Sequence, residues 1–214
     1  MTETTQVEQL DKLPPSLKAS VGITADRLQK DYLQRGSTPA GAEARRCLAE
    51  LRKFAARRVQ DSPLALENVL MMLTPSLSDG ELGRGEELSR SERAAFHAMS
   101  LFGVHMQSAN KPMHSTENSF AFACGQLFAR SSSKSIKPRF DAMQAAGDEE
   151  SRIVHLRSLV SLLRAQQLSF DYGRFAQDLR SLSNPSRKNG VLMRWGRDFA
   201  RGAQNRASTA AENS

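Results

Sequence analysis

The chain has 214 residues, of which 39% are hydrophobic and 25% are charged, enough for one good hydrophobic core or two small lobes. No apolar run approaches the length of about 18 residues that a membrane span needs, and the polar, acidic start from Met1 to Gln9 lacks the pattern of a signal peptide. We therefore expect a soluble, cytoplasmic protein rather than a membrane protein.

The net charge of +7 is concentrated at one end of the chain. Between Ser151 and Arg206 there are eleven Arg and Lys residues against three acids, which gives this segment +8 and leaves −1 for the rest. A localised positive surface is typical of a protein that binds a polyanion. Because the chain has only two Tyr and one Trp, extensive base stacking is not supported, and we expect contacts mainly to the phosphate backbone.

Apolar residues at helical spacing predict an all-α fold, a helical bundle of about eight or nine helices with no strand signal. The segment 1–19 is polar and is expected to be a tail. A lobe of helices is expected over 20–130, with a long acidic loop at 74–90. Its helices are predicted at 25–34, 41–54, 64–73, 91–106 and 120–129.

A polar run over 130–137, rich in Ser and Lys, could separate this lobe from a second, basic lobe over 136–205. The residues 206–214 are expected to be a second tail. In the C-terminal lobe, helices are predicted at 140–146, 150–166, 172–182 and 191–203.

Several of these helices combine an apolar stripe with a basic one. In the last helix, Leu192, Trp195 and Phe199 share one face, and Arg194, Arg197 and Arg201 lie roughly opposite. For any single arginine, a stem that packs along apolar neighbours is the simpler explanation. For the whole set of arginines this explanation does not suffice, because an ordinary solvated helix face interleaves acids with its bases and these faces have almost no acids. We therefore predict that nucleic acid is bound by Arg45, Arg46, Arg52, Lys134, Lys137, Arg139, Arg157, Arg164, Arg194 and Arg197.

Signals for catalysis or metal binding are weak. Gly80, Gly83 and Gly85 are surrounded by acids and lack the strand and the Gly-Lys-Ser/Thr sequence of a phosphate-binding loop. No two of His97, His105 and His114 have the i,i+4 spacing of a helical ligand pair, so we expect core or surface histidines.

Cys47 and Cys124 are isolated and are expected in the core, whereas His155 could join a phosphate contact or border the core. No enzyme activity, metal or cofactor is predicted.

One family shows the same segments in the same order. They are His105-Met-Gln-Ser, Pro112-Met-His, Pro138-Arg-Phe, the run from His155 to Arg164, Leu168-Ser-Phe-Asp-Tyr, and Arg194-Trp-Gly-Arg-Asp-Phe199. An early Ala44-Arg45-Arg46 with Leu48 matches an arginine-rich helix of that family. From about Ala25 to Arg201 the sequence resembles CasB, the small subunit of the type I-E CRISPR Cascade complex.

The resemblance implies an all-helical subunit that does no chemistry and is present in two copies beside the backbone and large subunits. It implies a role in bracing the heteroduplex of guide RNA and target DNA and in holding the displaced strand.

Two interpretations from other classes stay open at this point. A free-standing helical DNA-binding regulator should show a helix-turn-helix with base-reading residues, which we do not find. An enzyme acting on nucleic acid should show clustered carboxylates, but the basic segment has only three scattered acids.

Overall fold

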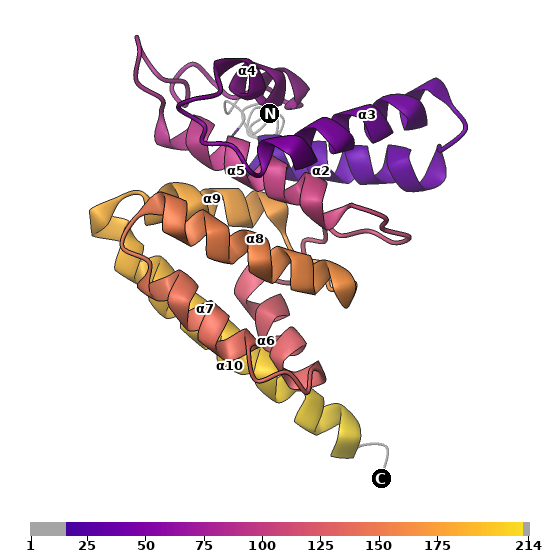
Figure 1. Ribbon diagram of the computed structural model, residues 1–214, viewed down its shortest axis with the longest axis vertical. Helices are drawn as coiled ribbons and strands as arrows, with labels where there is room; N and C mark the ends of the chain where they lie inside the picture. The colour runs from indigo at the N-terminus through magenta and orange to yellow at the C-terminus, as the bar shows by residue number, and fades with distance from the viewer. Residues whose placement is uncertain (1–15, 212–214) are drawn as a thin grey trace, which may run out of the picture.

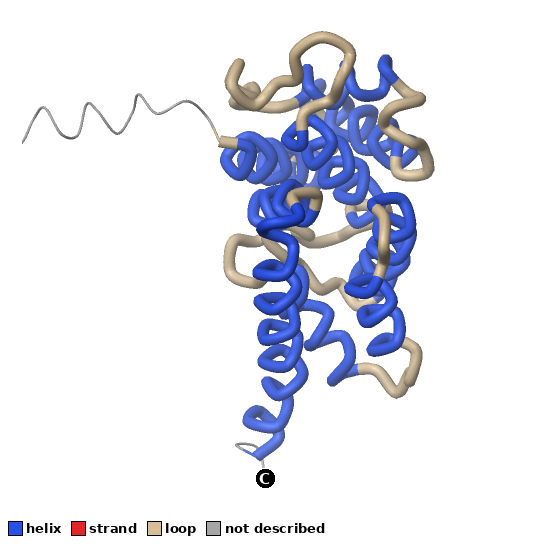
Figure 2. Tube along the Cα trace, turned by 90° about the vertical axis from the view of Figure 1, so that its left-hand side faces the viewer, coloured by secondary structure: helices blue, strands red, loops and turns tan. Residues whose placement is uncertain are grey.

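The computed structural model describes residues 16–211, and side chains up to residue 205 (Figure 1). Over these residues the fold is nine α-helices without a strand, as the sequence predicts (Figure 2), and a single β-bridge joins His114 and Phe170. None of the described helices is long and apolar enough to span a bilayer. The helices are α2 (Leu17–Gln34), α3 (Pro39–Phe54), α4 (Pro63–Met72), α5 (Arg90–His105), α6 (Phe120–Arg130), α7 (Ile136–Ala145), α8 (Glu149–Ala165), α9 (Tyr172–Leu182) and α10 (Pro185–Ala211).

Side-chain caps define where most of the helices begin. At the start of α5, Ser89 accepts a hydrogen bond from the backbone N–H of Glu92, and the Glu92 carboxylate accepts one from the N–H of Ser89. Such a cap contributes about 1 kcal/mol to helix stability. The residues that cap a described helix in this way are Ser16, Thr38, Ser89, Ser119, Asp148 and Asp171.

Helix α5 lies at the centre of the molecule. Apart from Arg93, every residue from Ser91 to His105 is buried, as expected for a helix surrounded by others. It packs against α2, α3, α4, α8 and α9, and Figure 1 shows it running between α3 and α8. The described core is one continuous cluster that extends from Leu17 to Phe199.

A close crossing of two glycines joins α6 to α10. A Cβ atom added to Gly125 would lie 2.1 Å from the carbonyl oxygen of Phe199, and one added to Gly202 would lie 2.1 Å from that of Phe122. Neither helix could approach the other so closely with a larger residue at this point. Although α6 precedes the polar linker in the sequence, it therefore packs against α10 and lies with the C-terminal helices (Figure 1).

The ends of two helices differ from the sequence prediction. Helix α2 begins at Leu17 rather than near residue 25, so the last residues of the expected 1–19 tail are helical. The reason is that Leu17, Val21, Ala25 and Leu28 form one buried stripe. Residues 1–15 lie outside the described part of the chain.

Helix α10 begins at Pro185 instead of 191, because proline is tolerated in the first turn of a helix. It also continues to Ala211, past the start of the tail expected at 206–214, since no proline interrupts it.

Trp195 anchors α10, and its replacement should be costly. The indole is fully buried, packs on Phe120 and Phe175 at centroid distances of 5.3 and 6.3 Å, and donates from Nε1 to Asp178 at 2.6 Å. We expect Trp195→Ala to lower the free energy of unfolding by about 3–5 kcal/mol in urea denaturation. Met193→Ala, at a residue that is 60% exposed on the same helix, is the matched control. An equal effect of both changes would contradict the packing described here.

Candidate nucleic-acid interface

Helices α3 and α8 flank α5 and run in opposite directions along it. The backbone at Leu51 lies against Gly103, while the Phe54 ring stacks on Phe96 at 6.3 Å, so α3 is antiparallel to α5. Gly103 has no room for a side chain, because an added Cβ would lie 2.6 Å from the backbone nitrogen of Arg52. This contact fixes the basic end of α3 against α5.

Helix α8 runs parallel to α5 on the other side. Near its start, Glu149 lies 4.0 Å from His97, and near its end Arg164 donates to the side-chain oxygen of Gln107, just after α5. Arg52 and Arg164 are therefore both near the C-terminal end of α5. Arg157, about 10 Å before Arg164 along α8, is nearer the middle of α5.

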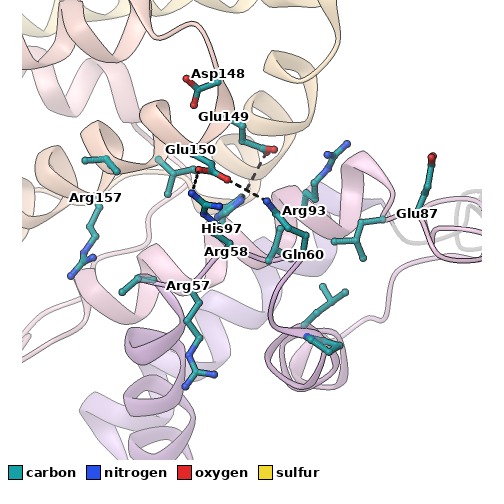
Figure 3. Close-up of a pocket in the computed structure, with 18 of the residues that line it drawn as sticks. Arg57, Arg58, Gln60, Glu87, Arg93, His97, Asp148, Glu149, Glu150 and Arg157 are labelled. Carbon is teal, nitrogen blue, oxygen red and sulfur yellow. Dashed lines mark hydrogen bonds and ion pairs between the residues drawn. The ribbon is translucent and has the colours of Figure 1, made fainter.

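A pocket of about 1190 Å³ opens between the end of α3, the start of α5 and the start of α8. Arg57 and Arg157 line it, and Figure 3 shows the two side chains on the same side of the pocket. The Arg57 guanidinium lies 5.9 Å from the centroid of Phe54, a cation–π distance that orients it. Both arginines are exposed and have no acidic partner among the described residues.

We call Arg52, Arg57, Arg157 and Arg164 the α5-flanking arginines. They lie two on each side of α5, on α3 or just after it and on α8, and none forms an ion pair with a described acid. Arg164 uses a neutral amide oxygen, so its charge is not cancelled. The unbalanced charge makes this part of the surface suited to an anionic ligand.

The rest of the pocket is lined by acids and is bridged by polar contacts. Glu150 on α8 accepts from Arg58 at 3.0 Å and from Gln60 at 3.3 Å, both in the loop after α3. Glu86 and Glu87 line the pocket from the long loop before α5. The pocket as a whole is therefore of mixed charge, since Arg58 and Arg93 also line it, and Arg57 and Arg157 lie together on one side of it (Figure 3).

On α10 the arginines of the expected basic stripe are mostly paired with acids. Arg194 donates to the buried carboxylate of Asp178, and Arg201 to that of Asp198, which also accepts from Arg174 at 3.1 Å. Acids of α9 and α10 therefore pair with two of the three arginines of this stripe. Of these three, Arg197 alone is exposed without an acidic partner among the described residues.

The environments of the two carboxylates differ. Burial raises the pKa of Asp178, against the opposing hydrogen bond from the Trp195 indole. For Asp198 burial acts in the same direction, but the hydrogen bond from Ser119 at 2.7 Å and the charge of the arginines outweigh it, so its pKa is lowered.

The remaining predicted residues fall into three groups. Arg46 pairs with Glu43 at 2.6 Å and Glu50 at 3.0 Å, and Lys137 pairs with Asp141 at 2.6 Å. The hydrogen bond from Arg46 lowers the pKa of Glu43 to about 2. Arg45 and Arg139 donate to neutral oxygens, those of the Gly36 carbonyl and the Ser158 hydroxyl. Arg52, Lys134, Arg157 and Arg197 have no acidic partner among the described residues.

Arg57, which follows α3, is not among the residues that the sequence predicts to bind nucleic acid. The signal that could have found it is its position after the last apolar residue of that helix, where a side chain is free to reach a neighbouring element. What brings it into the same pocket as Arg157 is the packing of segments far apart in the chain, which no local pattern reports.

Cysteines and histidines occupy structural positions, as the sequence predicts. Cys47 and Cys124 are buried and free. His105 contacts the Tyr172 hydroxyl at 3.0 Å, and His114 accepts from the backbone N–H of Tyr172 at 3.1 Å. His155 is half-buried. No three His, Cys, Asp or Glu residues in the described part of the chain are grouped so that they could hold a metal.

The glycine-rich loop before α5 also fails as a phosphate site. The backbone N–H of Gly83 donates to the Glu92 carboxylate at 3.0 Å. This N–H of the loop is therefore not available to bind a phosphate.

The chain is similar to one protein family and to solved structures. A family model described as CRISPR-associated protein Cse2 matches residues 47–199. The crystal structure of CasB from Thermobifida fusca has a TM-score of 0.65 at 24% identity, covering 84% of this chain and 97% of that one. A CRISPR-associated protein of the Cse2 family from Thermus thermophilus has a TM-score of 0.57 at 21% identity, covering 87% and 98%. These two likenesses show a shared fold. No curated protein matches the chain.

His97 at the pocket gives a test of the buried geometry. Burial, assisted by Arg93, lowers the pKa of His97 to about 4, so at pH 7 it is neutral and the 4.0 Å approach to Glu149 is not a salt bridge. Below the unfolded-state pKa of about 6.5 the unfolded chain takes up a proton that the folded chain does not, so stability falls as the pH drops toward 4.

We expect His97→Gln to remove about 1 kcal/mol per pH unit from this dependence between pH 6 and pH 5, measured by urea unfolding at each pH. Glu149→Gln should leave the dependence unchanged. An unchanged slope in His97→Gln would mean that this histidine is not shielded as described.

Proposed function

The chain belongs to the CRISPR-associated Cse2 family, and from this membership we propose that it is the small, nucleic-acid-binding subunit of a type I-E Cascade complex. In this proposal the protein does no chemistry. It stabilises the heteroduplex of guide RNA and target DNA, and the displaced strand, in antiviral defence in the cytoplasm. Its partners are the backbone and large subunits and a second copy of itself.

Phosphate contacts suit this role because the guide supplies the sequence specificity. Exchange of a DNA duplex for a guide–target heteroduplex is nearly balanced in free energy, so modest contacts from the protein can decide whether the open loop persists. A subunit that accepts every target must avoid base-edge contacts, and Arg or Lys aimed at phosphates gives affinity without sequence preference.

The observation that carries the proposal is the set of α5-flanking arginines. Four guanidinium groups, three of them on α3 and α8 and one just after α3, have no described acidic partner and leave an excess of positive charge that a phosphate backbone would neutralise. Lys134 and Arg197 add further unpaired charges, and Arg45 and Arg139 keep their charge because their partners are neutral. For Arg46, Lys137 and Arg194 a phosphate would have to compete with an acid of the same chain.

The salt dependence of target binding tests this proposal. We expect Arg157→Ala with Arg164→Ala, in complexes reconstituted with guide RNA, to reduce the slope of log affinity against log salt by about 1.4–1.8, since each lost phosphate contact removes about 0.7–0.9. Arg52→Ala with Arg57→Ala should do the same, and the reduction should be equal for several unrelated target sequences.

The matched control is Lys30→Ala with Arg35→Ala, which removes two charges on α2 that already pair with Asp26 and Asp31. Its effect on the slope should be smaller. Unchanged slopes in both test variants, with complex assembly intact, would refute the proposed phosphate contacts.

A second prediction follows from the proposed absence of chemistry. We expect the purified protein to leave labelled single- and double-stranded nucleic acids intact for hours, with or without magnesium or zinc, and to need neither metal for binding. Gel analysis of the strands checks both points. Metal-dependent cleavage that disappears in His105→Ala would overturn this part of the proposal.

A further inference from the structure

One aromatic side chain of this protein is not used by the core. Phe128 on α6 is 39% exposed, and it is the one aromatic residue among the large hydrophobic side chains that are exposed in the described part of the chain. Scattered surface hydrophobics are common and need no explanation by themselves. The surroundings of Phe128 set it apart from the others.

The Phe128 ring is supported from below by a stack of buried rings. It lies 5.7 Å from the centroid of Phe199, which in turn stacks on Phe140 at 4.4 Å with an interplanar angle of 29°. Phe199 and Phe140 are 5% and 1% exposed. This contact restricts the Phe128 side chain in part, which lowers the side-chain entropy lost when a second flat group packs against it.

The segment of the chain around Phe128 is basic and contains no acids. Between Glu117 and Asp141 the sequence has four bases, Arg130, Lys134, Lys137 and Arg139, and no acid. Lys137 reaches the same stack, with its ammonium 5.8 Å from the centroid of Phe199, and its charge is shared with Asp141. Lys134, in the turn just before α7, is exposed and has no described partner. This part of the surface favours an anionic ligand over a neutral or basic one.

We propose that Phe128 is a stacking platform for an unpaired base, with Lys137 at the same ring cluster and Lys134 in the preceding turn available for the phosphates of the same strand. The inference rests on the proposed function and names the ligand as single-stranded nucleic acid. An exposed ring beside a basic segment is the combination that single-strand sites use, and it tolerates any base because every base has a flat face. A duplex would not profit from it, because its bases are already stacked on one another.

The test compares strands with and without bases. Fluorescence anisotropy with the full chain would measure binding of a labelled strand of about 12 thymidines, an abasic strand of the same length, and a duplex. We expect Phe128→Ala to weaken binding of the thymidine strand by about 5- to 150-fold, which corresponds to about 1–3 kcal/mol for one stacked base. On the abasic strand, and likewise on the duplex, Phe128→Ala should bind with the same affinity as wild type. Phe128→Trp should keep the affinity for thymidine, and Met193→Ala, which removes another exposed apolar side chain, should match wild type.

Several outcomes would overturn the inference. Equal binding of thymidine by Phe128→Ala and wild type, or an equal loss on the abasic strand, would show that no base stacks on the ring. A loss of self-association or of incorporation into the complex, with strand binding intact, would assign Phe128 to a protein contact. If wild type binds none of the three probes, alone or in the complex, the proposed function fails together with this inference.

Discussion

Two buried carboxylates decide which arginines of the C-terminal helices remain available for a ligand. Asp178 and Asp198 are 4% and 2% exposed, and an ionised carboxylate so far from water must be compensated by donors of opposite or partial positive charge. Asp178 takes the Trp195 indole and Arg194, and Asp198 takes Ser119, Arg174 and Arg201. These contacts tie α10 to α9 and to the start of α6. They also neutralise most of the positive charge of the arginines on α10, so the surface best suited to phosphates lies elsewhere.

That surface depends on how closely α3 approaches α5. Gly103 lets the backbone of α3 lie directly against the central helix, and α8 packs along the opposite side. Arg52 and Arg57 thus come to one side and Arg157 and Arg164 to the other, and none of the four forms an ion pair with a described acid. In a folded protein without ligand these charges repel one another weakly through solvent. A polyanion lying along this face of the helices would relieve that repulsion, and its affinity would fall with salt as counterions compete.

Much of the fold could be predicted from the sequence, because helix-forming patterns and caps are local. The class, the approximate number of helices, the burial of Trp195 and Phe199, and the structural role of the cysteines all follow from spacing along a single helix. Only some of the ion pairs could be predicted from the sequence. Glu43 and Glu50 lie three and four residues from Arg46, so these ion pairs could have been predicted as i,i+3 and i,i+4 contacts. The pairs between Arg194 and Asp178 and between Arg174 and Asp198 join different helices, and no periodicity within one helix reveals them.

The central claim is that the α5-flanking arginines, and not the acid-paired ones, contact nucleic acid. The most direct measurement is modification by an arginine-selective reagent, mapped by mass spectrometry on the assembled complex before and after target DNA is bound. We predict that Arg52, Arg57, Arg157 and Arg164 are modified in the complex before target is added and protected after it binds, while Arg35, which pairs with Asp31 at 3.3 Å on α2, changes little. Undiminished modification of all four arginines in a complex that holds its target would contradict the account.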